Sequence, residues 1–490
     1  MPLFLLSAAG IITYANDQGG GSVGNNMISV EHQSLSRLLR AFRLRCKEKQ
    51  NLAETRLQDA MRRRGPEVLA SSSRSVVGPG KVAWLEKGGR GNLFLSETDW
   101  QLLAEAYNIP RLMLDPLRVP VTDSTCLVQQ WDRLVRLGED VPSEYGMAAS
   151  YFAPEARLVN TEEAAFVLLR LQAGGCSQVH AHPGDEMLLV LEGTVEALLE
   201  TTGLSVQLEK GDYLHFYSEQ RHSVKNSSDD PAMVFVIRFY QLSRSGTRSE
   251  LFQQLQKTRR DKYVTNRAIR EMISVVTPTN LREKDVSAGE VSDRGGLGRL
   301  LQLLSTRRGP GPGSQISVRQ LQQRARKLGL SYTASKIDRI HHGLAPIPES
   351  DLPELAKVYR TEPMLLYEFL YPALRSAIAV RSRADYREIP PAHVGSYTGV
   401  YRVPCRRLAD SDLGVAQLIL PKDAATPVNR HPGHEMLVPL RGHAHLRIAG
   451  LETDITAGKH LYVHYSSDTE HQVVNTDDET VQLMVIRFYE

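Results

Sequence analysis

Two long stretches of the sequence, residues 121–245 and 376–490, consist of short apolar runs separated by glycine and aspartate. The runs Ala165–Leu171, Met187–Leu191 and Met233–Phe239 are rich in Val, Leu, Ile and Phe. Runs of this length and composition, bounded by turn-forming residues, are typical of β-strands. We therefore expect each stretch to form a β domain.

A different spacing of apolar residues occurs ahead of the second stretch. Leu297, Leu300, Leu301 and Leu304 lie along one side of a predicted helix. The same spacing is found in three further segments, which contain Leu321 and Ala325, Ile337 and Ile340, and Leu355 and Tyr359. Gly343 follows the third helical segment and is a candidate C-cap. Residues 297–375 therefore predict a helical domain.

The chain contains the same unit twice. Three pairs of segments match. Residues 95–107 match 347–359 at an offset of 252 residues. At an offset of 249 residues, His182–Gly193 matches His431–Gly442, and Val236–Tyr240 matches Val485–Tyr489. Three landmarks in one order at a nearly constant offset indicate duplication of a whole unit. Each unit is a helical part followed by a β part.

The repeat and the changes of pattern divide the chain into six segments. We expect a flexible N-terminal segment (1–30), a helical domain (31–120), a β domain (121–245), a helix and linker (246–296), a second helical domain (297–375) and a second β domain (376–490). Within the fourth segment, Glu250–Met272 has a helical pattern and Val276–Gly296 that of a polar linker. A chain of 490 residues is too long for one core, which agrees with this division.

Each β part carries two histidines and a glutamate at matching positions. In the first, His182 and Glu186 flank a Pro-Gly pair, and His222 follows on a later predicted strand. A Pro-Gly pair favours a tight turn, which brings the imidazole and the carboxylate to one spot. The second β part repeats the set as His431, Glu435 and His471.

The surrounding residues resemble the two sequence motifs of the cupin superfamily. The first unit has His180-Ala-His182-Pro-Gly-Asp-Glu186, Gly193, Gly211, His222 and Asn226. The second unit has Asn429–Glu435, Gly442, Gly458, His471 and Asn475. The resemblance implies an α+β chain in which each helical domain precedes a cupin barrel, a double-stranded β-helix or jelly roll.

Two imidazoles and one carboxylate on one face of an ion form the facial triad that non-haem Fe(II) uses. We expect a divalent metal at each set, with Fe(II) favoured and Mn, Zn, Ni and Co as alternatives. A cupin barrel that has lost its metal usually lacks a ligand, whereas both sets here are complete. His180 is a candidate fourth ligand. Its counterpart Asn429 is a candidate substrate contact or strand cap.

Residues 316–371 resemble the helix-turn-helix of the lambda-repressor class, with helices at Leu321–Gly329 and near Ile337–Ile340. The first copy is poorer, because Pro66–Gly80 inserts after a candidate first helix at Arg56–Arg64. Two interpretations stay open: DNA binding through basic helix faces, and a purely structural helical domain. The structural interpretation is favoured.

A helical domain joined to a cupin occurs in small transcription regulators and in phosphonate oxygenases. The tandem units and the run Leu191-Glu192-Gly193 after Glu186 resemble the second group, which includes hydroxypropylphosphonate epoxidase, hydroxyethylphosphonate dioxygenase and methylphosphonate synthase. This resemblance implies an Fe(II)-dependent oxygenase that uses O2 and a small anionic substrate such as a hydroxyalkylphosphonate. It places a substrate-side tyrosine at Tyr401 and, less clearly, at Tyr151.

Part of the phosphonate oxygenase pattern is missing. The epoxidase has a lysine just before the second helix of its helical domain, and neither copy here has one in register, with Lys49 the nearest. This departure puts the substrate in doubt, but not the metal. The alternatives are a DNA-binding regulator with metal- or ligand-sensing cupins, and a storage or scaffold bicupin. A regulator should keep an intact recognition helix in each DNA-contacting unit.

Arg238 and Arg487 lie in the repeated strand Val-Ile-Arg-Phe-Tyr. One interpretation is an outward-facing strand arginine. The other is an anion contact at the barrel mouth, because a guanidinium binds phosphonate or carboxylate through two parallel hydrogen bonds. Five further histidines lack metal-ligand spacing and are interpreted as ordinary polar positions: His215, His434, His443, His460 and His464.

Composition gives limited information on the partners and the cellular environment of the chain. A net charge of +3 does not require a nucleic-acid partner. The four cysteines share no CxxC spacing, which argues against a disulfide framework and predicts a reducing, cytoplasmic environment. No apolar run approaches the ~18 residues of a membrane helix, so no membrane partner is expected. The sequence leaves open whether the chain forms a homo-oligomer.

Overall fold

The computed structural model describes residues 28–239 and 294–488, with gaps at 46–49, 65–76, 90–91, 139–144, 159–163, 201–202, 308–315, 370–372, 375–377, 382–386, 389–399, 404–405, 408–412 and single positions 120, 123, 125, 219, 362 and 368. Two compact units emerge. The described residues up to 124 and from 133 to 239 form the first unit, and residues 126–132 join residues 294–488 in the second.

The helical part of the first unit contains four helices of six or more residues among those described, and a short strand pair. Its elements are β1 (Ile28–Glu31), α1 (His32–Arg45), α2 (Gln50–Arg63), α4 (Val82–Lys87), β2 (Asn92–Leu95), α5 (Glu97–Tyr107), α6 (Arg111–Leu114) and the 3-10 helix η1 (Asp115–Arg118). Helix α5 begins with a capping box, in which the Ser96 hydroxyl accepts from the Asp99 amide and the Asp99 carboxylate accepts from the Ser96 amide. Strands β1 and β2 pair in antiparallel fashion.

The first barrel is built from antiparallel strands. They are β5 (Val135–Leu137), β6 (Gly146–Ala153), β8 (Ala164–Ser177), β9 (Asp185–Glu192), β10 (Thr194–Leu199), β11 (Leu204–Glu209), β12 (Tyr213–Tyr217), β13 (His222–Asn226) and β14 (Ala232–Phe239). The pairing order runs β11-β10-β13-β8-β14-β9-β12, and β6 pairs with both β5 and β8. A short parallel pair joins β3 (Val121–Thr122) to β7 (Arg157–Leu158).

The helical part of the second unit contains α9 (Arg294–Arg307), α10 (Val318–Lys327), α11 (Ala334–His341), the 3-10 turn η4 (Glu349–Asp351), α12 (Leu352–Tyr359) and α13 (Pro363–Tyr367). Ser317 and Gln320 form a capping box at the start of α10, and the Thr333 hydroxyl caps α11. The apolar stripes predicted from the sequence are buried, including Leu297, Leu321 and Ile337.

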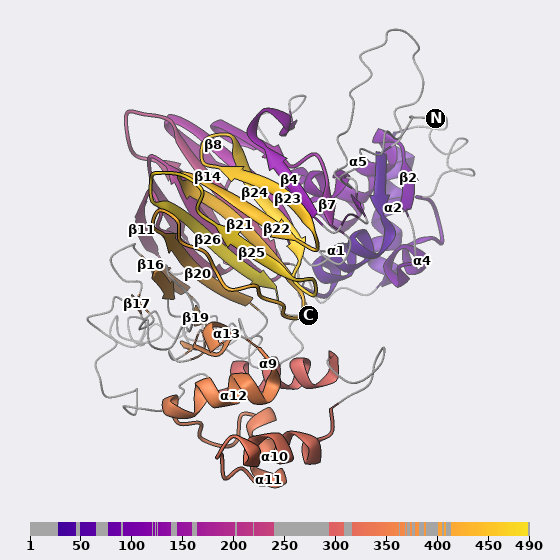
Figure 1. The fold of residues 1–490 in the computed structure, drawn as a ribbon. Helices are drawn as coiled ribbons and strands as arrows, with labels where there is room; N and C mark the ends of the chain where they lie inside the picture. The colour runs from indigo at the N-terminus through magenta and orange to yellow at the C-terminus, as the bar shows by residue number, and fades with distance from the viewer. Residues whose placement is uncertain are drawn as a thin grey trace, which may run out of the picture. The chain divides into compact units, whose positions relative to one another are not determined.

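The second barrel repeats the pairing of the first. Its strands are β17 (Arg387–Glu388), β18 (Val400–Val403), β20 (Leu413–Leu420), β21 (His434–Arg441), β22 (His443–Ile448), β23 (Leu451–Thr456), β24 (His460–Ser466), β25 (His471–Val474) and β26 (Val481–Phe488). One sheet has the order β17-β18-β20-β26-β21-β24-β4, and β23-β22-β25 form a second sheet (Figure 1). Three short strands, β15 (Ala373–Leu374), β16 (Ile378–Arg381) and β19 (Arg406–Arg407), lie between α13 and β20 in the sequence.

Strand β4 (Cys126–Gln130) was not expected at this place. The sequence pattern assigns its residues to the first β domain, but β4 pairs with β24 and belongs to the second unit. Val128 stands opposite Val463 in this pairing. Strand β4 has five residues and no neighbouring motif, so its sequence does not indicate a pairing partner that lies more than 300 residues later in the chain.

Most predicted elements agree with the structure. The three apolar runs lie within β8, β9 and β14, and the four helical segments are α9 to α12. In the first helical part, the candidate first helix at Arg56–Arg64 lies almost entirely within α2. Eighteen residues separate α2 from α4, and α4 is only six residues long. The prediction that residues 1–30 form a flexible segment is wrong at its end, because Ile28–Glu31 is a strand. Residues 1–27 lie outside the described chain. Segment 246–296 also lies outside it, apart from the start of α9.

No helix in the described part of the chain combines the length and apolarity needed to cross a lipid bilayer.

Candidate metal centres

The Pro-Gly turn ahead of each glutamate has a defined geometry. Gly184 and Gly433 both adopt φ +93°, a conformation that favours glycine because it has no Cβ. Backbone hydrogen bonds tie each turn to the strand opposite: the His182 amide donates to Ser218 O (3.0 Å), and the His431 amide donates to Ser467 O (2.8 Å). The turn therefore holds the histidine and the glutamate of each set close together.

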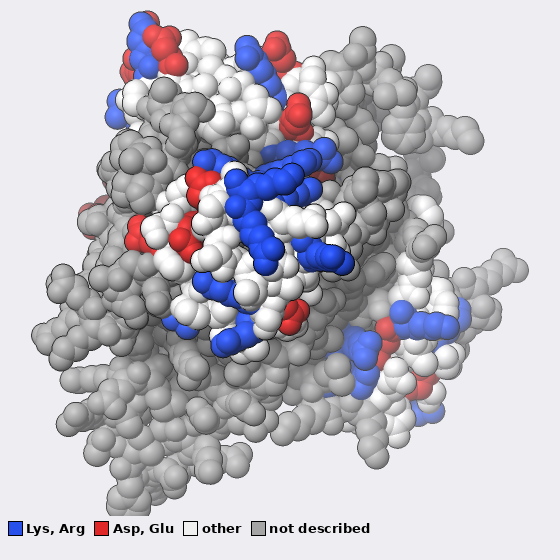
Figure 2. Space-filling view, turned by 60° about the horizontal axis from the view of Figure 1, so that its bottom comes forward, with Lys and Arg blue, Asp and Glu red and all other residues white. Residues whose placement is uncertain are grey.

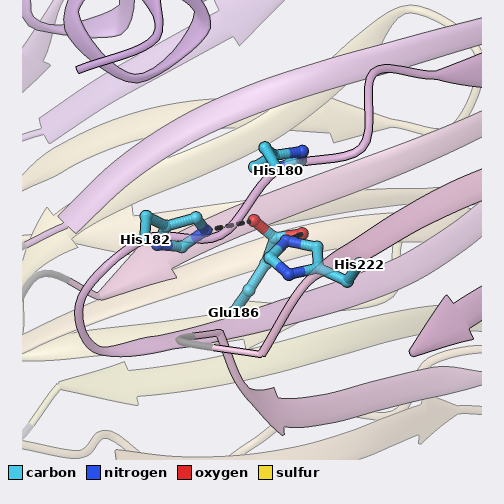
Figure 3. Close-up of side chains that lie close together, drawn as sticks. All are labelled: His180, His182, Glu186 and His222. Atoms are coloured by element: carbon cyan, nitrogen blue, oxygen red, sulfur yellow. Dashed lines mark hydrogen bonds and ion pairs between the residues drawn. The ribbon is translucent and has the colours of Figure 1, made fainter. Parts of the chain in front are cut away.

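In the first barrel, four side chains converge inside the fold (Figure 3). One ligand atom from each of His180, His182, Glu186 and His222 lies within 4.8 Å of the other three. His182 Nε2 is 2.9 Å from Glu186 Oε2, and His222 Nε2 is 3.6 Å from Glu186 Oε1. All four residues are buried.

Backbone carbonyls orient these imidazoles. His180 Nδ1 lies 2.7 Å from Gln178 O, and His222 Nδ1 lies 2.8 Å from Gln220 O. An N–H at Nδ1 that donates to a carbonyl leaves Nε2 as the atom with the lone pair, which is the usual arrangement behind a metal-ligating histidine. The buried Nε2 atoms of His180 and His222 have no hydrogen-bond partner within the described residues.

Burial and charge set the ionisation of the first group. Burial lowers the pKa of His180 well below its usual value and that of His182 to about 4, so both imidazoles are neutral at neutral pH. Burial alone would raise the pKa of Glu186, but His222, His182 and Arg238 outweigh it and hold that pKa well below the usual range. Neutral imidazoles and an ionised carboxylate are the forms that bind metal.

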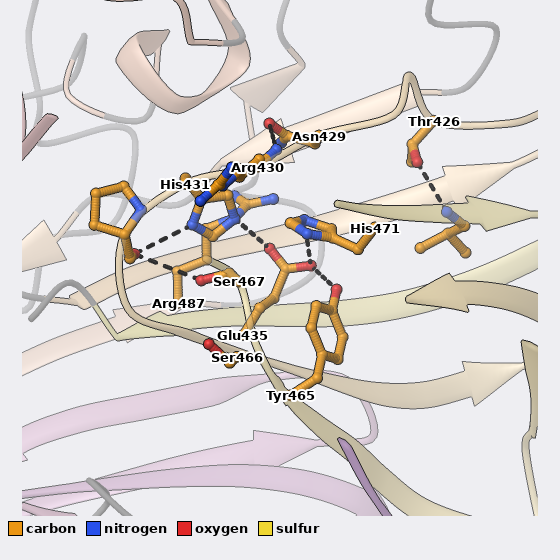
Figure 4. Close-up of polar contacts among 12 residues, drawn as sticks. Thr426, Asn429, Arg430, His431, Glu435, Tyr465, Ser466, Ser467, His471 and Arg487 are labelled. Carbon is orange, nitrogen blue, oxygen red and sulfur yellow. Dashed lines mark hydrogen bonds and ion pairs between the residues drawn. The ribbon is translucent and has the colours of Figure 1, made fainter. Parts of the chain in front are cut away.

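The second barrel repeats the arrangement with three donors (Figure 4). His431 Nε2 is 3.2 Å from Glu435 Oε2, and His471 Nε2 is 4.0 Å from Glu435 Oε1. The Tyr465 hydroxyl donates to Glu435 Oε1. Burial lowers the pKa of His471 to about 4, and Arg487 is the strongest of the groups that keep the pKa of Glu435 low against the effect of burial.

Asn429 occupies the place of His180 in the second barrel. Its backbone pairs with His471, as that of His180 pairs with His222. Its side-chain oxygen accepts from the Arg430 amide at 2.8 Å. This contact fits the strand-cap interpretation of Asn429.

Arg238 and Arg487 point inward. Both are buried, and the strand register places each one directly beside a glutamate, Arg238 opposite Glu186 and Arg487 opposite Glu435. Their Nε atoms lie 3.0 Å and 2.6 Å from the glutamate Oε2 atoms. The outward-facing interpretation is therefore wrong. Strand β14 is buried on both faces, so the alternation of residues gave no clear sign of direction.

The two candidate tyrosines occupy equivalent strand positions. Tyr151 on β6 stands opposite Leu169, and Tyr401 on β18 stands opposite Leu418, which is the counterpart of Leu169 at the offset of 249. Tyr151 is buried, and its ring lies 6.0 Å from the guanidinium carbon of Arg238. The side chain of Tyr401 lies outside what the structure describes.

Sequence reasoning missed several residues of these sites. Phe216 and Tyr465 stand opposite the two glutamates. The offset of 249 aligns these two residues with each other, but only the strand pairing places them beside the glutamates. Of the five histidines interpreted as ordinary polar positions, His215, His434, His460 and His464 are buried, so that interpretation is wrong for these four. His434 and His464 form a pair. Both are buried with ring centres 5.4 Å apart, and burial lowers the pKa of His464 well below its usual value.

The donor chemistry fits a divalent transition metal in both barrels. Each set offers buried imidazole Nε2 atoms and an ionised carboxylate, and carbonyls or arginine hold each donor in place. A carboxylate with neutral imidazoles suits Fe(II), Mn, Co, Ni or Zn. The residues present would therefore hold such an ion.

The fold and these motifs define the class of domain. Residues 167–238 and 416–487 both match the cupin domain family. The chain carries two cupin domains, each with a His/Glu group that could hold a metal. A search among curated proteins finds no match.

A comparison with solved structures returns matches of low identity. Streptomyces albus HEPD, with 2-hydroxyethylphosphonate and Fe(II) bound, is 12% identical, covers 94% of this chain and 92% of its own, and gives a TM-score of 0.38. A mutant of Bacillus subtilis oxalate decarboxylase OxdC is 14% identical over 75% of this chain and 78% of its own, with a TM-score of 0.37. AerE from Microcystis aeruginosa is 9% identical over 75% of this chain and 100% of its own, also at 0.37.

Proposed function

We propose that this chain is a mononuclear non-haem Fe(II)-dependent oxygenase that acts on a small anionic substrate. The observation that carries the proposal is the donor set: buried imidazoles, with His182 and His471 held neutral by burial, meet an ionised carboxylate in each cupin domain. Such a set leaves coordination positions open for small molecules. A structural site, in contrast, is normally closed by protein ligands.

Fe(II) bound to such a set would supply the redox chemistry that activates O2. The chain's own residues would bind and orient. Arg238 and Arg487 hold one oxygen of their glutamates, and the apolar core around the sites excludes water. Candidate substrate contacts are Tyr151, Tyr401, Asn429, Arg238 and Arg487. The suggestion of a hydroxyalkylphosphonate rests on the sequence resemblance to the phosphonate oxygenases.

Oxygen consumption tests the proposal. The Fe(II)-reconstituted protein should consume O2 when given the right member of a panel of hydroxyalkylphosphonates and hydroxycarboxylates. Glu186→Gln and Glu435→Gln each remove the charged ligand of one site, so loss of uptake in one variant identifies the working barrel. Uptake that is unchanged in the double variant would show that the cupin sites are not responsible.

A second candidate, a DNA-binding regulator, is favoured by one surface. Arg319, Arg326 and Lys327 on α10 are exposed and make no ion pair with any described residue. Figure 2 brings the α10–α11 region forward and shows more Lys and Arg than Asp and Glu on it. Exposed cations on a helix can neutralise the phosphates of a duplex.

Salt dependence separates the two candidates. If α10 binds DNA, Arg326→Ala should lower the slope of log affinity against log salt by about 0.9 for each phosphate that is no longer neutralised. Lys357→Ala is the matched control, because Lys357 is also exposed and pairs with Glu354 on α12. A protected DNA site that persists at physiological salt would favour the regulator.

A further inference from the structure

The two metal centres differ at two of six matched positions, which are the glutamate and five residues near it. At the offset of 249 residues, four positions keep their residue type: His182 and His431, Glu186 and Glu435, His222 and His471, and Arg238 and Arg487. The other two change. His180 becomes Asn429, and Phe216 becomes Tyr465. The two centres in one chain can therefore be compared to find the structural effect of each of these two changes.

Phe216 and Tyr465 occupy the same place in their barrels. Phe216 pairs opposite Glu186 on β12, and Tyr465 pairs opposite Glu435 on β24. Each ring packs on the last histidine of its set, with ring centres 4.8 Å apart in the first barrel and 5.1 Å in the second. Both side chains are buried. The hydroxyl of Tyr465 is thus the only group that this change adds.

That hydroxyl changes the state of the glutamate. In both centres Oε2 is held by an arginine and a histidine: Glu186 by Arg238 and His182, and Glu435 by Arg487 and His431. The Oε1 atoms differ. Within the described residues, the polar contact of Glu186 Oε1 is the one to His222 at 3.6 Å, whereas Glu435 Oε1 accepts a hydrogen bond from Tyr465.

We propose that Tyr465 is a positioning residue that restricts Glu435 to one metal-binding oxygen and makes the second centre the one that admits a chelating substrate. The hydroxyl engages Oε1, whereas Oε2, which also accepts from Arg487, lies 3.2 Å from His431 Nε2 and is the oxygen placed beside another metal ligand. Among the described residues of the first centre no hydroxyl donates to Glu186 Oε1, so this oxygen can join Oε2 in binding a metal.

The change from His180 to Asn429 acts in the same direction. The first centre offers three imidazoles and a carboxylate, and the second offers two imidazoles and a carboxylate. An ion with six ligands keeps at most two free positions in the first centre and three in the second. A substrate that binds through two oxygens needs, together with O2, three positions. We infer that the first centre holds its ion tightly and the second exchanges ligands.

This inference rests on the proposed function, and metal binding without turnover can test it. On the background His182→Ala/His222→Ala only the second centre remains, and on His431→Ala/His471→Ala only the first. Co(II) affinity is measured by competition with a chelator. Acetohydroxamate, a two-oxygen chelator, is titrated while the visible absorption of Co(II) is followed. Tyr462→Phe, another buried tyrosine on β24, is the control for loss of a hydroxyl.

The reciprocal substitutions should have opposite effects. Tyr465→Phe frees Glu435 Oε1, so acetohydroxamate should bind the second centre more weakly and Co(II) more tightly, by up to about 10-fold, which is the size of one hydrogen bond to a charged group. Phe216→Tyr should weaken Co(II) binding at the first centre by a similar factor. A merely structural role would instead lower Co(II) affinity in both variants, since disturbing an outer-shell group usually costs affinity.

Each outcome decides a separate question. Unchanged Co(II) and acetohydroxamate binding in Tyr465→Phe, or losses of metal affinity in both reciprocal variants, would overturn the role of Tyr465. Acetohydroxamate binding only at the first centre would overturn the assignment of the second as the substrate-admitting site. If neither centre of the wild-type protein binds Co(II), Fe(II) or Mn(II), the proposed function itself fails.

Discussion

At the scale of single residues, each centre depends on a carboxylate that stays charged inside the protein. Glu186 and Glu435 are both buried, and each lies against an arginine on the neighbouring strand. A buried ion pair of this kind costs desolvation energy, and removing one partner leaves an uncompensated charge. We interpret this cost as the price of presenting an ionised carboxylate to a cation.

Metal content should follow these glutamates one site at a time. Two complete donor sets predict up to two ions per chain after anaerobic reconstitution, measured by elemental analysis. Glu435→Gln removes the charged ligand of its own site, so metal affinity there should fall by more than the ~10–100-fold typical of an outer-shell change. The first site should be unaffected in this variant. Loss of both ions would contradict independent sites.

The metal-free protein should lose stability on mild acidification. Burial lowers the pKa of His182 and His471 to about 4, from about 6.5 in the unfolded chain. The unfolded state then binds more protons between these values, so the free energy of unfolding falls as pH drops from about 6.5 to 4, by about 3 kcal/mol for each histidine. Below the usual pKa of a glutamate, Glu186 and Glu435 add to the loss, because their pKa values are held low.

Urea unfolding at a series of pH values in the presence of a chelator measures this effect. The variant His182→Gln should flatten the dependence between about pH 6.5 and 4 relative to the wild type. A stability that is constant over this range would contradict the pKa shifts.

At the scale of elements, the Pro-Gly turns link chain geometry to the metal site. Gly433→Ala places a Cβ at φ +93° and should cost about 1–2 kcal/mol of stability. It should also lower metal affinity at the second centre, because the turn fixes the distance between His431 and Glu435. Gly450→Ala is the matched control, since Gly450 has φ +81°, lies in the turn between β22 and β23, and has open space where the new Cβ would stand.

Thermal unfolding and Co(II) titration together check this prediction. Both variants should melt earlier by similar amounts, and only Gly433→Ala should bind less metal. Equal metal affinity in the two variants would mean that the turn does not position the ligands.

Elements whose signal is local could be predicted from the sequence, and those defined by distant partners could not. Short apolar runs of Val, Leu, Ile and Phe identified β8, β9 and β14, and the helical spacing of apolar residues identified α9 to α12. The metal ligands followed from their spacing around a turn. Tyr465 was missed because its role depends on a strand pairing between β21 and β24, and no spacing within β24 shows it. The inward direction of Arg238 was missed because β14 is apolar on both faces.

At the scale of the whole molecule, the two repeats are not separable at a single point in the sequence. Strand β4 precedes the first barrel in the chain but completes the edge of β24 in the second unit. Residues 294–490 expressed alone would leave that edge of β24 unpaired, and unpaired strand edges promote aggregation.

Size-exclusion chromatography of this fragment tests the role of β4. The fragment should aggregate alone and become more soluble when a peptide of residues 124–133 is added in excess. A peptide of the same composition in scrambled order is the control. A fragment that stays monomeric without the peptide would show that the pairing with β4 is dispensable.

The position of β4 also bears on the ancestry of the chain. A single-copy ancestor would have carried the equivalent strand ahead of its one barrel. If that strand paired as β4 does, its partner was the barrel of a second molecule, and the ancestor was a dimer held together by exchanged strands. Fusion of two gene copies would then have turned an association that depended on concentration into a covalent one. The two metal centres would have become free to diverge, because a change in one would no longer appear in both.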